Sequence, residues 1–270
     1  MLELRGVTKT FHAGTPKSVR ALDGVGLALE PGSFVVVIGT NGSGKSSLLN
    51  AVAGTFLVDS GTILLDSRDV TRWQEHQRAK LIGRVFQNPF SGTAPTMSIA
   101  ENLALAARRG RPRRLGWGLP GQLKKELRER VKVLGMGLED RLNNPIGSLS
   151  GGQRQALTLL MATWIKPKLL LLDEHTAALD PKSAEQVIRL SEQTISRERL
   201  TTLMVTHSMH QAAHLGDRLL MMDHGRVIHD FRGAEKRRIR VDDLMARFDE
   251  LRRREKLDET AAEMLRRAYV

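Results

Sequence analysis

The chain has 270 residues, with 42 Lys and Arg against 30 Asp and Glu, a formal net charge of +12, and no cysteine. An apolar fraction of 41% and a charged fraction of 27% are typical of a folded globular protein and exclude a disordered chain, a collagen or a disulfide scaffold. The absence of cysteine also excludes zinc–thiolate sites, iron–sulfur clusters and cysteine nucleophiles. Because the sequence has no run of about 18 apolar residues and Glu3 is unlike a signal peptide, we expect a cytoplasmic protein.

The first part of the chain alternates between strand and helix patterns. The segment 34–38 is wholly apolar and rich in β-branched residues, which is typical of a strand buried on both faces. A glycine-rich loop and a helix over about 45–53 follow it. The strands predicted in this part are 2–8, 21–29, 34–38, 63–65 and 84–86.

From Gln87 to about Pro167 the pattern becomes helical and basic and is interrupted by Pro and Gly, which indicates an inserted helical subdomain. Strand patterns then alternate with helical ones, and this alternation predicts a parallel sheet covered on both faces. After Val227 we expect a helical tail of mixed charge. The strands predicted here are 169–172, 203–206 and 219–222, and the helices are 181–196 and 209–215.

Much of the positive charge lies in one segment. Residues 108–132 contain ten Lys and Arg against two Glu. The segment is consistent with a solvated surface, with a contact to an anionic membrane surface, or with a contact to nucleic acid. Trp117, which lies between two glycines, favours the membrane interface among these.

A phosphate-binding loop follows the first buried strand. Residues 39–46 satisfy the pattern G-x-x-x-x-G-K-S between a strand and a helix. Three glycines let the backbone adopt positive φ and close around a phosphate, while successive N–H groups face the anion. Lys45 would contact the β- and γ-phosphates, and Ser46 would offer its hydroxyl to Mg²⁺. A chance glycine-rich turn is the alternative. The predicted nucleotide-binding set is Gly39, Asn41, Gly42, Ser43, Gly44, Lys45, Ser46 and Ser47.

Two carboxylates end the apolar strand predicted at 169–172. Hydrolysis of a nucleotide needs one acid near Mg²⁺ and another that orients or deprotonates water. Adjacent residues point in different directions, so they can divide these tasks. We assign Asp173 to Mg²⁺ and Glu174 to the general base. Two solvated acids at the start of a loop are the alternative.

A second anion-binding helix start is predicted at residues 149–153, Leu-Ser-Gly-Gly-Gln, which precede an apolar helical run. Ser150 suits an N-cap, and Gly151 and Gly152 would let a phosphate approach the backbone. An ordinary Ser-capped helix is the alternative. Together with the phosphate loop, this segment suggests a nucleotide held from two sides.

In these segments the sequence resembles the ATP-binding cassette (ABC) ATPases. Residues 149–153 are identical to the signature of that family, and Asp173 follows Gln153 at the family's spacing. The resemblance covers residues 2–230 and implies an α/β fold: a P-loop NTPase (RecA-like) core with an N-terminal antiparallel β subdomain and an inserted α-helical subdomain. The implied division is 1–86 for the β subdomain and the first part of the ATP-binding core, 87–167 for the α-helical signature subdomain, 168–229 for the rest of the core, and 230–270 for a C-terminal helical tail.

The resemblance also implies a head-to-tail homodimer with two ATP molecules at its interface. Each ATP would lie between Lys45 of one protomer and the segment Ser150, Gly151, Gly152 and Gln153 of the other. Asp180 matches the D-loop that crosses this interface, and a helix N-cap before Pro181 is compatible with that role.

Three further positions match family residues one at a time. Gln87 matches the Q-loop glutamine that touches Mg²⁺ and the attacking water. His207 matches the switch histidine that senses the γ-phosphate. Phe11 matches the aromatic residue that stacks on adenine, although the family more often has Tyr there and a core phenylalanine is the alternative. His175 departs from the family, because many transporter ATPases have Pro at this position.

The function implied is the energising subunit of a bacterial importer, bound to the cytoplasmic face of the inner membrane. Its partners would be a separate permease and a substrate-binding protein, and aromatic amino acids are one suspected cargo of the branch with Asp-Glu-His-Thr. The alternative is a soluble ABC ATPase acting on nucleic acid or ribosomes, and a third is a cytosolic ATPase of cofactor assembly. One phosphate loop, one signature and no sustained heptads argue against a nucleic-acid partner.

Overall fold

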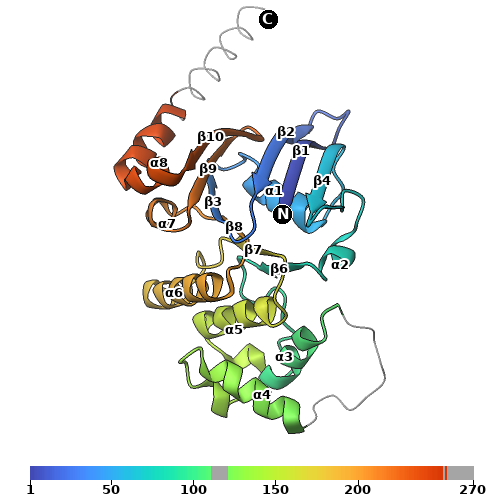
Figure 1. Cartoon of the computed structure of the whole chain (residues 1–270), viewed down its shortest axis with the longest axis vertical. Helices are drawn as coiled ribbons and strands as arrows, with labels where there is room; N and C mark the ends of the chain where they lie inside the picture. The colour runs from blue at the N-terminus through green and yellow to red at the C-terminus, as the bar shows by residue number, and fades with distance from the viewer. Residues whose placement is uncertain (111–120, 252, 254–270) are drawn as a thin grey trace, which may run out of the picture.

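The computed structural model describes residues 1–110, 121–251 and 253, and it contains two sheets (Figure 1). The smaller sheet is antiparallel and has the strand order β2-β1-β4-β5. The larger sheet has the order β10-β9-β3-β8-β7-β6. The strands are β1 (Leu2–Phe11), β2 (Val19–Leu29), β3 (Phe34–Gly39), β4 (Ser60–Leu65), β5 (Arg68–Asp69), β6 (Ile82–Val85), β7 (Leu169–Asp173), β8 (Thr202–Val205), β9 (Arg218–Asp223) and β10 (Arg226–Arg232).

The larger sheet is parallel from β9 to β6, and only β10 pairs antiparallel at its edge. Its central strand β3 is buried on both faces, as the apolar pattern predicts. Val35 and Val37 point into one hydrophobic cluster, while Val36 and Ile38 point into another on the opposite face. Because parallel strands end at the same edge of a sheet, the loops after β3, β6, β7 and β8 all emerge together there.

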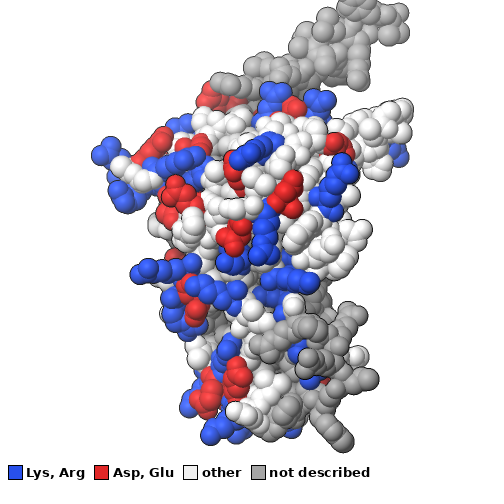
Figure 2. Space-filling model, turned by 45° about the vertical axis from the view of Figure 1, so that its right-hand side comes forward, with Lys and Arg blue, Asp and Glu red and all other residues white. Residues whose placement is uncertain are grey.

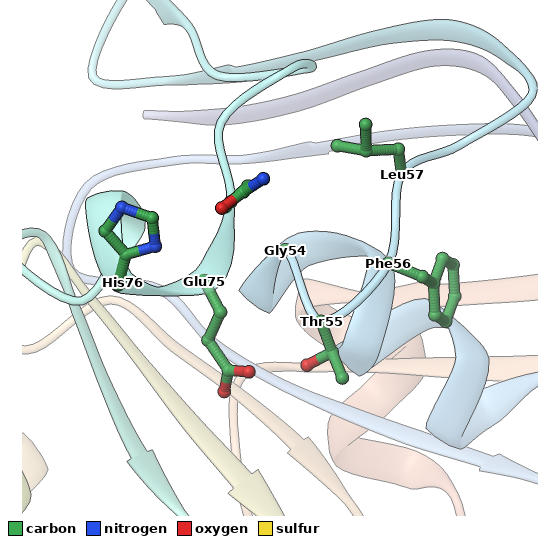
Figure 3. A pocket seen from close by; sticks show the side chains of 7 residues that line it. Gly54, Thr55, Phe56, Leu57, Glu75 and His76 are labelled. Carbon is green, nitrogen blue, oxygen red and sulfur yellow. The ribbon is translucent and has the colours of Figure 1, made fainter.

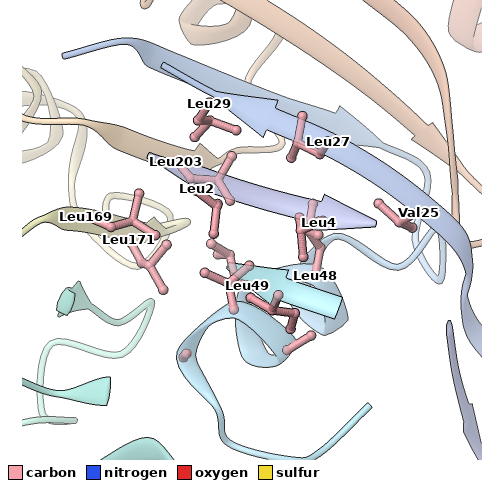
Figure 4. Close-up of a cluster of buried hydrophobic side chains, with 14 of the residues drawn as sticks. Leu2, Leu4, Val25, Leu27, Leu29, Leu48, Leu49, Leu169, Leu171 and Leu203 are labelled. Atoms are coloured by element: carbon pink, nitrogen blue, oxygen red, sulfur yellow. The ribbon is translucent and has the colours of Figure 1, made fainter. Parts of the chain in front are cut away.

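The helix α1 (Lys45–Ala53) lies between the two sheets (Figure 4). Its Leu48 and Leu49 are fully buried in a cluster that contains Leu2 of the small sheet and Leu171 of the large sheet. This packing holds the first turn of α1 rigidly beneath the loop that precedes it. Burial of each such leucine contributes about 1.5–3 kcal/mol.

The opposite face of the large sheet is covered by α5 (Gly151–Thr163), α6 (Pro181–Glu198) and α7 (Met209–His214). Residues 241–250 are also helical and follow α8 (Gly233–Arg238). Two of their side chains, Leu244 and Phe248, join the same cluster. Because these two residues lie four positions apart, they share one face of the helix. The charged tail therefore packs on the core through an apolar face.

A third hydrophobic cluster lies in the helical part at the bottom of Figure 1, among α3 (Ile99–Ala107), α4 (Gly121–Lys132) and α5. The helix α5 belongs to two clusters. Its Leu159 and Ala162 pack on the large sheet, whereas Ala156 and Leu157 pack on α3 and α4. Through α5 the helical part is fixed to the core. The short helices in this part and before it are α2 (Glu75–Arg78), η1 (Leu138–Asp140) and η2 (Ile146–Ser148).

Two expectations differ from the structure. The strand predicted at 84–86 lies at Ile82–Val85, and Phe86 is outside it. The stretch after Val227, predicted to be helical, continues first as β10 to Arg232. This edge strand is largely polar, and Phe231 is its one buried side chain. Such a sequence has too weak an apolar pattern to predict a strand.

The basic segment 108–132 is partly structural. Arg109 donates to the carbonyls of Ala162 and Ile165 at 2.9 and 2.7 Å, which satisfies the C-terminal end of α5. Arg130 donates to Trp164 O at 2.9 Å and stacks over its ring at 4.2 Å. Residues 111–120, including Trp117, lie outside the described residues. In the described part of the chain, no helix is long and apolar enough to cross a membrane.

Candidate nucleotide-binding site

The loop between β3 and α1 depends on its glycines for two different reasons. Gly42 and Gly44 have φ of 82° and 97°, the left-handed region that glycine adopts without strain. Gly39 has no positive φ. A Cβ there would lie 2.3 Å from Met222 O and 2.4 Å from Ser43 Oγ, so its role is close approach. The expectation of positive φ is therefore wrong for Gly39.

Lys45 opens α1 and is 5% exposed. Its Nζ donates to the carbonyls of Gly39 and Thr40 at 2.9 and 2.8 Å, so the ammonium lies inside the turn of the loop. Burial lowers the pKa of Lys45, and the Glu174 carboxylate opposes this shift. The ammonium is thus placed where an anion entering the loop would meet it.

The loop has the donors that a phosphate requires. Ser43 Oγ is buried next to Gly39 and has no hydrogen-bond partner among the described residues. A buried hydroxyl of this kind costs about 1–3 kcal/mol unless a ligand or water satisfies it. The N-terminus of α1 adds backbone N–H groups and its positive dipole end. The residues therefore fit the triphosphate of a nucleotide.

Glu174 follows β7 in a strained backbone conformation, with φ of 44°. Its N–H donates to Val205 O at 3.0 Å, which ties the turn to the end of β8. The Glu174 side chain is 9% exposed, and its Oε1 lies 2.5 Å from His207 Nε2. Strain of about 1–3 kcal/mol persists only where neighbouring contacts hold it, and here it aims a carboxylate at the histidine.

A hydrogen-bonded network joins the turns that carry these two residues. Gln211, on α7, donates from Nε2 to Thr176 Oγ1 at 3.1 Å. Thr206 donates its hydroxyl to Gln211 Oε1 at 2.6 Å and accepts from the Ser208 N–H at 3.1 Å. The network spans the loops after β7 and β8, so it fixes the relative position of Glu174 and His207. Sequence reasoning missed Gln211, because a polar residue four positions after His207 has no signal of its own.

His175 takes the position where the family more often has proline. Its side chain is 1% exposed, and Nε2 lies 3.0 Å from Ser191 Oγ on α6. Ser191 in turn donates to Val187 O at 2.9 Å. Burial lowers the pKa of His175 to about 4. A neutral imidazole therefore tethers the strained turn to α6, where proline would stiffen it.

Asp173, the last residue of β7, forms an ion pair with Arg84 at 3.1 Å. Ser46 lies in the first turn of α1, and Gln87 follows β6. Their carboxylate, hydroxyl and amide oxygens are hard ligands of the kind that Mg²⁺ prefers, completed by phosphate oxygens. This donor set fits Mg²⁺.

A cavity of about 740 Å³ is lined by predicted residues from four loops, although Lys45, Ser46 and Asp173 are not part of its lining. It is lined by Gly39 and Asn41 of the phosphate loop, Gln87, Glu174 and His207. Phe248, from the tail, also lines it, and no sequence motif marks this residue. Parallel pairing of β3, β8, β7 and β6 brings these segments together, although they lie far apart in the chain.

The signature segment lies outside this cavity. Ser150 caps α5: its Oγ accepts from the Gln153 N–H at 3.3 Å, and its own N–H donates to Gln153 Oε1 at 3.2 Å. A Cβ on Gly152 would lie 2.6 Å from Ser183 Cβ, so glycine allows α5 to pack closely on α6. Gln155 donates to Phe86 O at 2.9 Å, which connects α5 to the residue before Gln87.

Asp180 and Phe11 also lie outside the cavity lining. Asp180 is the N-cap of α6 and accepts from the Ser183 N–H at 3.0 Å, with Pro181 at the first helical position. Hydrogen bonds from the Ser183 side chain and from its N–H lower the pKa of Asp180. Phe11 ends β1 and packs edge-on against Phe56, with ring centroids 5.1 Å apart.

A family model described as ABC transporter matches residues 22–177. The chain belongs to the ABC transporter family. A tyrosine transport ATP-binding protein of Clostridioides difficile is 39% identical over 251 residues, which cover 92% of this chain and 99% of that protein. A methionine import ATP-binding protein of Bacillus thuringiensis is 34% identical over 237 residues, covering 85% of this chain and 66% of that protein.

Among solved structures, a dimeric ATP-binding cassette in a post-hydrolysis state, bound to ADP and Pi, aligns with a TM-score of 0.73 and 28% identity. The alignment covers 86% of this chain and 98% of that one. The predicted α/β fold of a P-loop NTPase is thereby confirmed. The chain is an ATP-binding, ATP-hydrolysing subunit of an ABC transporter.

Proposed function

We propose that the 740 Å³ cavity holds ATP and Mg²⁺, and that Glu174 activates the attacking water. The observation that carries this proposal is the convergence of the phosphate loop, Gln87, Glu174 and His207 on one cavity. Lys45 and the N–H groups of the loop hold the phosphates, and His207 contacts both Glu174 and the terminal phosphate. When bound at Ser46, Asp173 and Gln87, Mg²⁺ supplies positive charge against the phosphate oxygens. Phe11 contacts the adenine.

We further propose that hydrolysis requires two copies of the chain, arranged head to tail. Ser150 is exposed at the start of α5 and lies outside the lining of its own cavity, which supports a role in a partner's site. The helix N-terminus offers N–H groups and a positive dipole end to the phosphates of the other copy. Asp180 lies at the neighbouring start of α6, where it contributes to the same interface. The dimeric cassette bound to ADP and Pi supports this arrangement.

ATP hydrolysis by this subunit is coupled to transport by a separate membrane permease. A second cavity of about 590 Å³ lies between the loop after α1 and the helix α2 (Figure 3). Phe56 and Leu57 line it, and Leu57 is 47% exposed. Phe90, in the loop after Gln87, is 55% exposed. We assign these apolar side chains to a cytoplasmic segment of the permease, so the subunit is peripheral on the cytoplasmic face of the inner membrane.

The proposed direction is import, and the proposed cargo class is an aromatic amino acid delivered by a substrate-binding protein. The tyrosine transport relative supports the cargo, and the methionine import relative supports the direction. We propose the division at 87–167 for the helical subdomain because α3, α4 and α5 share a hydrophobic cluster of their own.

Action on nucleic acid or ribosomes is less well supported. On the face shown in Figure 2, Lys and Arg side chains are interspersed with Asp and Glu and form no continuous basic stripe. Arg128 and Arg130 of the basic segment pair with Asp140 and Glu126, each at 3.0 Å. Paired cations offer less charge to a phosphate backbone.

Affinity purification of the Glu174→Gln protein from detergent-solubilised cells, with ATP and Mg²⁺, tests the function. We expect a polytopic membrane protein to copurify in stoichiometric amount and to be lost when Leu57→Glu is added. Ile228→Glu, a matched change of an exposed apolar residue on β10, should retain it. Copurification of ribosomal proteins or nucleic acid that resists moderate salt would contradict the transporter function and favour the alternative.

A further inference from the structure

Arg84 carries a guanidinium that no motif of the family explains. It lies on β6, and its side chain is 12% exposed. Nη2 donates to Asn50 Oδ1 at 2.7 Å and to Asp173 Oδ2 at 3.1 Å. Nη1 donates to Thr55 Oγ1 at 3.2 Å and lies 3.9 Å from Glu75 Oε1. The guanidinium also stacks over the ring of Phe86, 4.6 Å from its centroid.

The two ends of this guanidinium face two different sites. Thr55 and Glu75, the partners of Nη1, line the 590 Å³ cavity shown in Figure 3. Asp173, the partner of Nη2, is the acid assigned to Mg²⁺. The parallel register places Arg84 beside Leu171, two residues before Asp173, and thus brings the arginine to this acid.

We propose that Arg84 is a positioning residue that fixes the Asp173 carboxylate and couples it to the cavity at Thr55 and Glu75. The proposal rests on the assignment of Asp173 to Mg²⁺ made above. A guanidinium remains charged at all physiological pH values and holds a carboxylate in a defined plane. Its positive charge also weakens the attraction of that carboxylate for a second cation.

The coupling follows from the shared guanidinium. A group that enters the cavity and accepts a hydrogen bond from the Thr55 hydroxyl, or donates one to the Glu75 carboxylate, changes the contacts of Nη1. Because the guanidinium is rigid and planar, Nη2 then moves with respect to Asp173. Occupancy of the cavity thereby alters how strongly Asp173 attracts a divalent cation.

The test measures how binding of a fluorescent ATP analogue depends on Mg²⁺ concentration, in the Glu174→Gln background so that no hydrolysis occurs. In Arg84→Met, the half-saturating Mg²⁺ concentration should fall by about tenfold, because the opposing charge next to Asp173 is gone. Arg84→Lys keeps the charge that opposes the cation, so its half-saturating Mg²⁺ concentration should stay within about twofold of the parent. Arg189→Met, on the exposed face of α6, removes an equal charge far from Asp173 and should change nothing.

Thr55→Val tests the coupling itself and replaces an exposed residue, so folding is retained even if Arg84→Met unfolds. We expect a shift in the half-saturating Mg²⁺ concentration of about twofold in the parent and none when Arg84→Met is also present, since interacting residues are not additive. Equal Mg²⁺ dependence of Arg84→Met and the parent, or additive effects of the two changes, would overturn the proposal. Asp173→Asn separates the two hypotheses. If it leaves Mg²⁺ dependence unchanged, the assignment of Asp173 fails; if it removes that dependence while Arg84→Met does not shift it, only the role of Arg84 fails.

Discussion

His207 Nε2 lies 2.5 Å from Glu174 Oε1, although the two residues follow different strands of the large sheet. Glu174 is almost fully buried and strained, whereas the His207 side chain is 47% exposed toward the cavity. The histidine can therefore contact both Glu174, the proposed general base, and a phosphate that enters from solvent. This contact makes the position of Glu174 dependent on what His207 binds.

Glu174→Gln should bind ATP with Mg²⁺, lose hydrolysis by at least about 10²-fold and accumulate as an ATP-bound dimer. An amide retains the shape of the carboxylate but accepts no proton, and general bases contribute about 10²–10⁴-fold to rate. Phosphate release and size-exclusion chromatography measure the two effects. A monomeric variant with wild-type turnover would show that Glu174 is not the base.

Gln211→Leu should lower the rate of hydrolysis by about tenfold, which corresponds to about 1.4 kcal/mol, while the Kd for ATP stays within about twofold. The substitution leaves the hydroxyls of Thr176 and Thr206 without their partner, and the turns that carry Glu174 and His207 then move independently. Single-turnover kinetics and equilibrium ATP binding separate rate from affinity. A variant with an unchanged rate would refute a positioning role for Gln211.

The buried His175 predicts an acid-sensitive fold. Because burial lowers its pKa to about 4, the folded state holds it neutral, and protonation favours the unfolded chain as pH falls from about 6.5 to 4. Between pH 7 and pH 5 this group alone should remove about 2 kcal/mol from the free energy of unfolding. Urea unfolding at the two pH values should show that loss in the wild type relative to His175→Gln. If the free energy of unfolding depends equally on pH in the two proteins, His175 does not cause the acid sensitivity.

Arg78 supports the end of α1 from beneath. It is fully buried and donates to four carbonyls, those of Ala51, Val52, Trp73 and Thr71. Burial lowers its pKa to about 10, and Asp69 opposes this shift. Arg78→Met should lower the free energy of unfolding by about 3 kcal/mol, because these carbonyls become unsatisfied. Arg72→Met, at an exposed position, should change the free energy of unfolding by less than about 0.5 kcal/mol. Comparable losses in the two variants would refute the supporting role of Arg78.

The phosphate loop was predictable because a triphosphate favours fixed residue types at fixed spacing. Glu174 was assigned from its place at the end of an apolar strand, and His207 only through the resemblance to the ABC ATPases. The buried strand before the loop was predictable for a similar reason, since a strand covered on both faces must be wholly apolar. Gln211, Arg84 and Phe248 were not predictable. Each reaches the site through strand register or helix packing, and side chains that meet in this way have no local pattern.

The edge of the large sheet illustrates the same limit. Charged and polar residues interrupt β10, and Arg218 and Arg232 pair with Asp230 across and along it. These contacts, which oppose the effect of burial, lower the pKa of Asp230 to about 2. A strand stabilised by cross-strand ion pairs resembles a solvated helix in its composition. The segment is recognised as a strand only from its pairing with β9 in the structure.

The most direct test of the account mixes two inactive variants, Lys45→Ala and Ser150→Arg. In a head-to-tail dimer the mixed pair has both defects in one site and leaves the other site intact. We predict no ATPase activity from either variant alone and recovery to about a quarter of the wild-type rate on mixing, because half of randomly paired dimers hold one intact site of two. Activity of Lys45→Ala alone, or no recovery at any mixing ratio from folded variants, would contradict the composite site.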